Sequence, residues 1–179
     1  DTDVQRLNKL GALNPKNLGN LKFSAPPLPA EAEALNTLQS IIGNRPVFVA
    51  VSTHSGEEEI IATVHKNLKP RHPGLLTIII PRHSTRGLEI LRTIQPIMAN
   101  SVLRSKNGQI TDLTDIYIAD TMGELGLFYR LTEVVFMGKS LVPLGGQNPL
   151  EALNLNCAVL HGPHMTNFQS MSEQMIKLG

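Results

Sequence analysis

Seven residues between two short apolar runs have the types and spacing to bind an anion together with hydroxyl groups. They run from Gly145 to Glu151 and read Gly-Gly-Gln-Asn-Pro-Leu-Glu. Asn148 suits the N-cap of a helix, Pro149 its first position and Glu151 the third position of a capping box. Free N–H groups at a helix start can bind phosphate, and a carboxylate beside them can bind hydroxyls. The pattern indicates either a site for a nucleotide or nucleotide-linked sugar, or a plain helix cap.

A second polar cluster follows the first strongly apolar run of the chain. Ser52, Thr53 and His54 end that run, and Gly56 precedes three consecutive glutamates that begin with Glu57. Acidic residues in a first helical turn favour the helix dipole, which is one explanation for them. Three exceed what capping requires, so we expect His54 and Glu57 to face a cleft.

Two more strand ends carry candidate ligand-binding residues. Pro81 and Arg82 follow the most apolar run, and a guanidinium suits phosphate because it donates two hydrogen bonds and stays charged. A surface ion pair is the alternative for Arg82. Asp120 or Thr121 can cap the next helix, and Gly123 allows the backbone to approach a ligand closely.

Other cofactor chemistry is not favoured by the motifs. The glycines of the loop 138–146 fit neither the phosphate loop of nucleoside triphosphatases nor the dinucleotide fingerprint. His161 and His164 flank Gly162-Pro163, but the proline breaks any helix and no carboxylate lies nearby in sequence. We therefore expect no cofactor and no metal site.

The composition predicts a globular chain without a nucleic-acid partner. Of 179 residues, 41% are hydrophobic, 16 are Lys or Arg and 15 are Asp or Glu, so no strong field attracts polyanions. Aromatic residues make up 4%, too few for a base-stacking surface. The single cysteine, Cys157, allows no internal disulfide and reads as a small buried residue of a strand, which favours a reducing compartment. No apolar run reaches the length of a membrane span.

Alternating apolar runs and helical segments predict a doubly wound, parallel α/β sheet of Rossmann-like type. The predicted strands are 47–52, 76–80, 101–104, 116–119, 134–137 and 158–161. The predicted helices are 1–10, 30–42, 57–68, 85–95, 123–131, 149–154 and 167–178. Continuous apolar strands indicate a sheet covered on both faces. The turn at 106–109 is expected to belong to a small hairpin, and the segment 13–29, with its prolines, to be a stiff linker.

In such sheets ligands bind at the carboxyl ends of the strands. Read together, the strand ends resemble the C-terminal half of a 3-deoxy-D-manno-octulosonic acid (Kdo) transferase, the bacterial family that moves Kdo from CMP-Kdo onto the lipid A precursor. The matching segments occur in the family's order and cover nearly the whole chain. They are 19–23, 52–54 with 56–58, 81–83, 119–125, 145–146 with 148–151, and 162–164 with 167–168.

The resemblance implies a two-domain, B-type glycosyltransferase whose C-terminal domain holds the nucleotide. It assigns CMP contacts to ten residues: Pro81, Arg82, Met122, Gly123, Glu124, Leu125, Asn148, Pro149, Leu150 and Glu151. Residues expected in the cleft are Ser52, Thr53, His54, Glu57, Gly145, Gly146 and His164. Glu151 is expected to bind the ribose hydroxyls. Two departures are Lys139, where the family usually has glycine, and Gln147, where histidine is common.

By the same resemblance, residues 1–29 are the tail of the N-terminal domain with a linker, and 30–179 the domain that binds CMP-Kdo. The general base, the membrane anchor and most of the acceptor site belong to the N-terminal domain. Because the first residue is Asp1 and not Met, we expect a fragment, soluble and without transferase activity, of an enzyme on the cytoplasmic face of the inner membrane. Alternatives are a UDP-sugar epimerase domain and a nucleotide-binding module without catalysis.

Overall fold

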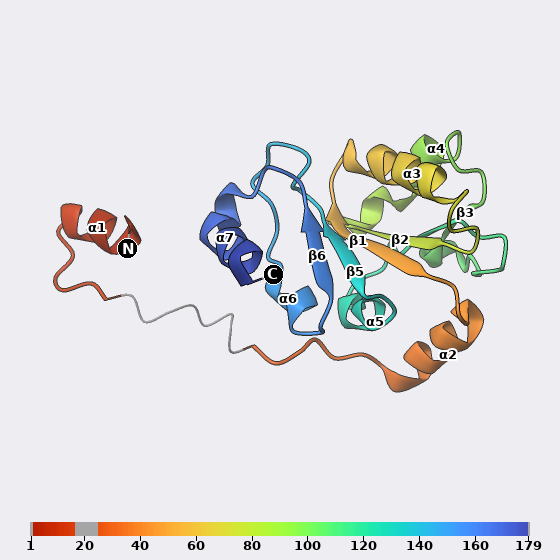
Figure 1. The fold of residues 1–179 in the computed structure, drawn as a ribbon, viewed down its shortest axis with the longest axis horizontal. Helices are drawn as coiled ribbons and strands as arrows, with labels where there is room; N and C mark the ends of the chain where they lie inside the picture. Colours follow the sequence, from red (N-terminus) through yellow and green to blue (C-terminus); the bar gives the residue numbers. More distant parts are fainter. Residues whose placement is uncertain (1, 17–24, 179) are drawn as a thin grey trace.

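The computed structural model describes residues 2–16 and 25–178 (Figure 1). Six strands form one sheet in the order β3-β4-β2-β1-β5-β6, and every pair is parallel. The strands are β1 (Val47–Thr53), β2 (Leu76–Pro81), β3 (Ser101–Leu103), β4 (Ile116–Ile118), β5 (Val134–Met137) and β6 (Ala158–His161). The predicted doubly wound α/β fold is confirmed.

Helices cover both faces of this sheet. They are α2 (Ala32–Ile42), α3 (Glu57–Leu68), α4 (Gly87–Ile94), α5 (Leu125–Tyr129) and α6 (Leu150–Leu153). The first and last helices of the chain are α1 (Thr2–Lys9) and α7 (Gln169–Leu178). Side chains of α2, α5 and α6 pack on one face with Val49 and Val51, and those of α3 and α4 pack on the other with Ala50. Successive residues of β1 thus enter different cores, as the two-residue period of a strand requires.

The end of the proline-rich segment packs against the domain. Arg130 donates to the carbonyl oxygen of Leu28 at 2.8 Å, and Asn154 donates to that of Ala25 at 3.3 Å. A Cβ at Gly126 would overlap the carbonyl oxygen of Pro29, so α5 tolerates this segment only because it has no side chain there. The helix α2 begins two residues later than expected, because the side chain of Glu31 caps it.

Two local expectations need correction, and a third falls outside the described residues. The turn at 106–109 is not part of a hairpin, because β3 and β4 pair in parallel and Asn107 ends a 3₁₀ turn inside the crossover between them. Only β2 and β4 are buried along their whole lengths. At the sheet edge, Ala158 and Leu160 of β6 are exposed, with Leu160 at 52%. The predicted motif at 19–23 lies outside the described residues.

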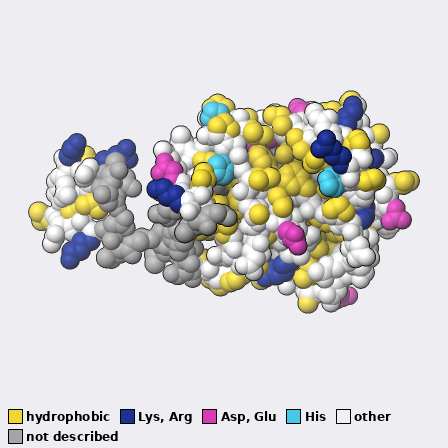
Figure 2. Space-filling model, in the orientation of Figure 1, with side chains coloured by type: hydrophobic (Ala, Val, Ile, Leu, Met, Phe, Trp, Pro, Cys, Tyr) yellow, Lys and Arg dark blue, Asp and Glu magenta, His cyan; other side chains and the backbone are white. Residues whose placement is uncertain are grey.

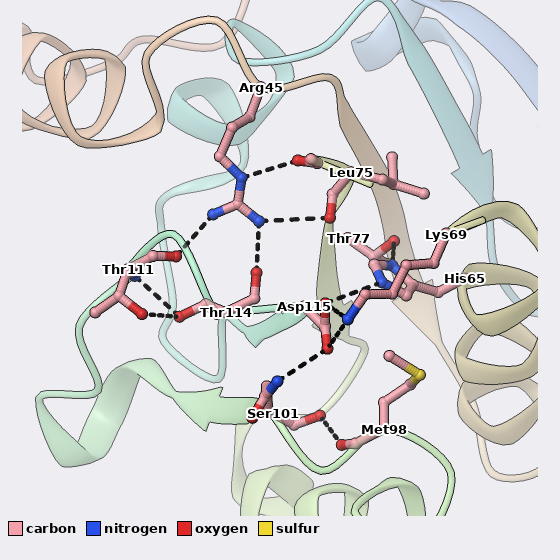
Figure 3. A network of polar contacts seen from close by, with 12 residues as sticks. Arg45, His65, Lys69, Leu75, Thr77, Met98, Ser101, Thr111, Thr114 and Asp115 are labelled. Atoms are coloured by element: carbon pink, nitrogen blue, oxygen red, sulfur yellow. Dashed lines mark hydrogen bonds and ion pairs between the residues drawn. The ribbon is translucent and has the colours of Figure 1, made fainter. Parts of the chain in front are cut away.

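A polar network joins the segments at the amino ends of the strands (Figure 3). This side of the sheet lies opposite the carboxyl ends of the strands. Arg45 donates to the carbonyl oxygens of Gly74, Thr111 and Thr114 at 2.5–2.9 Å, which joins the segments that precede β1, β2 and β4. Asp115 forms an ion pair of 2.7 Å with Lys69 at the end of α3. Hydrogen bonds within the protein therefore occupy the polar groups at the amino ends of the strands, and we expect the ligand site at the carboxyl ends.

Candidate functional site

An open pocket of about 460 Å³ lies at the carboxyl ends of β1, β2 and β4. Six predicted site residues line it: Ser52, Pro81, Arg82, Met122, Gly123 and Leu125. The remaining lining residues are Ile80, His83, Ser84, Thr85 and Thr121, which the sequence reasoning did not name as ligand contacts. The run His83-Ser84-Thr85, polar side chains between a buried strand and a helix, was the available signal. The pocket joins two of the four predicted strand ends and the last residues of a third.

Arg82 supplies the positive charge of this pocket. Its side chain is exposed, and within the described residues it has no ion pair, so the alternative of a surface ion pair is wrong. Its backbone is fixed, because its N–H donates to the carbonyl oxygen of Thr53 at 3.0 Å. A guanidinium held at its base and free at its tip suits an anion that enters from solvent.

Thr121, Met122 and Gly123 of the loop after β4 line the pocket, whereas the carboxylates of this loop bind other groups. Asp120 accepts from the backbone N–H and hydroxyl of Ser105, at 2.9 and 2.5 Å, and does not cap α5. Glu124 forms a two-point ion pair with Arg104, with distances of 2.8 and 2.5 Å. Glu124 therefore fixes Met122 and Gly123 from behind, and Gly123, with φ of 82°, needs the freedom of glycine.

This ion pair has opposite effects on the pKa values of its two partners. The hydrogen bonds to Glu124 raise the pKa of the Arg104 guanidinium, against the opposing effect of burial. Burial acts to raise the pKa of the Glu124 carboxyl, but the hydrogen bonds from Arg104 and Thr121 and the positive charge of Arg104 together outweigh it, and the pKa is lowered. Both groups are thus held in their charged forms.

The expectation that Glu57 faces the cleft is wrong. Its side chain is fully buried, and its carboxylate accepts hydrogen bonds from the backbone N–H groups of His54, Lys139, Ser140 and Leu141 at 2.7–3.0 Å. Thr53 is also fully buried. The half-buried His54 ring lies edge-on to the His83 ring, with centroids 6.4 Å apart, beside the pocket.

The segment from Gly145 to Glu151 leads into a shorter helix than the expected 149–154. Asn148 caps it, since its Oδ1 accepts from the N–H of Leu150 at 3.2 Å, but α6 has a single turn. Within the described residues Glu151 makes no hydrogen bond, so the capping box is not formed. One turn carries little dipole, and its first free N–H is taken by Asn148. Anion binding by this helix start alone is therefore not supported.

Residues 148–151 do not line the pocket, but α6 packs on the same face of the sheet as α5, which starts at the pocket. Burial raises the pKa of the Tyr129 hydroxyl in α5, and the nearby carboxylate of Glu151 raises it further. Gly145 and Gly146 have φ of 92° and 77°, and added side chains there would meet Asn167 and Met165.

His161 and Cys157 lie in structural contacts, and His164 has one through its backbone. His161 Nε2 lies 2.8 Å from the hydroxyl of Ser172 in α7, and the backbone N–H of His164 donates to the carbonyl oxygen of Ser140 at 3.0 Å. In residues 2–16 and 25–178 no three His, Cys, Asp or Glu side chains are grouped to hold a metal ion. Cys157 is buried, as predicted, and burial raises the pKa of its thiol.

The backbone at Lys139 explains why glycine is expected at this position. Lys139 has φ of 61°, a left-handed conformation that glycine adopts without strain and a lysine rarely does.

No helix within the described part of the chain has the length and apolar character needed to cross a bilayer.

Known proteins similar to this chain include several 3-deoxy-D-manno-octulosonic acid transferases. A 3-deoxy-D-manno-octulosonic acid transferase of Rickettsia felis is 35% identical over 177 residues, and that of Haemophilus influenzae is 34% identical over 164. These alignments cover 99% and 89% of the chain, and the chain spans 38% of the length of each relative. No family model matches the chain.

A solved structure is similar over most of its own length. It is the C-terminal CMP-Kdo binding domain of WaaA from Acinetobacter baumannii, with 33% identity and a TM-score of 0.70. The match covers 82% of this chain and 79% of that domain. On these similarities, the chain belongs to the 3-deoxy-D-manno-octulosonic acid transferase family and is similar to its C-terminal domain.

Proposed function

We propose that the chain is the donor-binding domain of a transferase that moves Kdo from CMP-Kdo to the lipid A precursor. The observation that carries the proposal is the pocket that joins the unpaired Arg82 to the backbone at Gly123. The likeness to a domain described as binding CMP-Kdo supports it. On the face shown in Figure 2, basic and acidic side chains are scattered and form no broad charged surface.

Each side of the pocket has a separate task in this proposal. The Arg82 guanidinium binds the phosphate of CMP and stabilises the negative charge that grows on it as the sugar departs. The backbone at Met122 and Gly123, held by the Glu124–Arg104 ion pair, contacts the nucleoside. Glu151 does not line this pocket, but its side chain makes no hydrogen bond within the described part of the chain and is available to accept from the ribose hydroxyls.

The remaining functions belong to the longer protein. We propose that residues 1–29 are the tail of an N-terminal domain and a linker, and that this domain supplies the general base, the acceptor site and the membrane anchor. The complete enzyme then works on the cytoplasmic face of the inner membrane. The 179-residue chain by itself binds CMP weakly and transfers no Kdo, since it lacks those groups.

Calorimetric titration of the chain with CMP and with UDP tests this function. We expect binding of CMP and at least tenfold weaker binding of UDP, a difference of about 1.4 kcal/mol. Preferred binding of UDP favours an epimerase-like domain and refutes the proposal. Binding of neither nucleotide also refutes it. Kdo transfer by the purified chain, in a preparation free of host enzyme, contradicts the proposed division of labour between the domains.

A further inference from the structure

The buried carboxylate of Glu57 connects two loops at the carboxyl edge of the sheet. One oxygen accepts from the backbone N–H groups of His54 and Lys139, at 2.9 and 2.7 Å. The other accepts from those of Ser140 and Leu141, both at 3.0 Å. A fully buried charge is costly unless hydrogen bonds replace its water, and these four donors do so.

Three of the four donors belong to a distant part of the chain, so this is not ordinary helix capping. They lie 82 to 84 residues beyond Glu57, in the loop that follows β5. Only His54 is local. The bonds therefore fix the position of the loop after β5 relative to the loop after β1. The pocket residue Ser52 lies at the end of β1, directly before that loop.

The backbone at Lys139, held by Glu57, in turn holds Gly146 of the pair Gly145-Gly146. The carbonyl oxygen of Lys139 accepts from the N–H of Gly146 at 2.8 Å, which closes the loop that leads to Asn148 and Glu151. Gly138, at the start of the same loop, backs directly on Ser52, since a Cβ there would lie 2.6 Å from the Ser52 carbonyl oxygen.

Ser140 connects the hydrogen bonds of Glu57 to the loop after β6. Its hydroxyl oxygen accepts from the N–H of Gly162 at 2.8 Å, and its carbonyl oxygen accepts from the N–H of His164 at 3.0 Å. Ser140 is fully buried, as is Glu57. The carboxyl-end loops of β1, β5 and β6 thus form one hydrogen-bonded unit with the Glu57 carboxylate at its centre.

We propose that Glu57 is a positioning residue of the donor site, which acts on the nucleotide through the loop 138–149. This inference rests on the proposed function, because it concerns the same CMP-containing ligand. Glutamine cannot replace the carboxylate, since its amide NH₂ would face backbone N–H donors with no acceptor to offer. Aspartate keeps four acceptor positions but is one methylene shorter, so it reaches the distant loop less well.

The experiment compares three variants of this chain by CMP titration and thermal melting: Glu57→Gln, Glu57→Asp and Glu59→Gln. Glu59 lies in the same helical turn, is partly exposed and makes no side-chain contact within the described residues, so its variant controls for the lost charge at the helix start. Well below the melting temperature we expect CMP binding to weaken about tenfold in Glu57→Gln, less in Glu57→Asp and not at all in Glu59→Gln.

A measurement on the unaltered chain covers the case in which the Glu57 variants do not fold. Addition of CMP is expected to shift the amide NMR signals of Lys139, Ser140 and Gly146, and to leave those of Thr111 and Thr114, at the opposite edge, unchanged. Unaltered CMP affinity in folded Glu57→Gln overturns the inference, as does the absence of those shifts on CMP binding. If the unaltered chain binds no CMP, the proposed function fails instead.

Discussion

Replacement of Arg82 by alanine separates ligand binding from stability. The arginine follows β2, lines the pocket and has an exposed side chain without an ion pair in the described part of the chain. Its one described bond uses the backbone N–H, which alanine retains. Truncation therefore removes no side-chain hydrogen bond or ion pair of the described structure, and we expect the free energy of unfolding to change by less than about 0.5 kcal/mol.

The expected loss of CMP binding follows from the exposure of this side chain. A hydrogen bond to a charged group contributes about 1.5–3 kcal/mol when it is sheltered from water. Because the Arg82 side chain is exposed and the pocket is open, we take the lower end of that range. This corresponds to CMP binding that is weakened about tenfold. Lysine keeps the charge but not the planar pair of donors, so Arg82→Lys should lie between the two.

Calorimetric titrations with CMP and with cytidine form the assay. Arg71→Ala is the matched control, because Arg71 is also exposed, makes no described side-chain contact and precedes β2 at the opposite edge of the sheet. We expect Arg82→Ala to weaken CMP but not cytidine, and the difference to shrink at high salt. Equal losses for CMP and cytidine, or an equal effect of Arg71→Ala, would refute phosphate binding by Arg82.

Two further predictions concern stability. Gly138→Ala places a Cβ 2.6 Å from the carbonyl oxygen of Ser52, which cannot rotate away, so we expect a loss of about 2–3 kcal/mol in denaturant unfolding; an unchanged midpoint contradicts the close approach. Burial lowers the pKa of His65, against the opposing pull of Asp115, so below pH 6.5 the unfolded chain binds a proton that the folded chain does not. Stability should then fall as the pH drops below 6.5, by up to about 1.4 kcal/mol per unit, and His65→Gln should flatten this slope whereas the same change at the exposed His72 should not.

Much of the fold could be predicted because each strand is a short apolar run between polar turns. The bounds of β5 and β6 and of α3, Glu57–Leu68, match the sequence prediction at both ends. The turn at Asn107-Gly108 was misassigned to a hairpin because this dipeptide favours a left-handed turn wherever it occurs. Whether such a turn joins antiparallel strands or lies within a crossover depends on pairing between strands, which the local residues do not encode.

The pocket was predictable to the extent that the topology determines it. Parallel strands bring their carboxyl ends to one side of the sheet, and Arg82 and Gly123 approach each other there because β2 and β4 are neighbours. The partners of the charged side chains were not predictable. Arg104 finds Glu124 across the β4 loop, and no periodic pattern connects the two positions.

The three glutamates at the start of α3 show why such partners escape sequence reasoning. All three satisfy the same local rule for acids in a first helical turn, yet Glu57 is fully buried and holds distant backbone N–H groups, and Glu58 pairs with Arg86 at 2.7 Å. Glu59 makes no described side-chain contact. Successive residues point about 100° apart around a helix. Their fates therefore differ because one points into the sheet edge, one toward the neighbouring helix and one toward solvent. The excess of carboxylates over capping needs is thus a signal of long-range hydrogen bonding, although only the fold reveals which of them makes it.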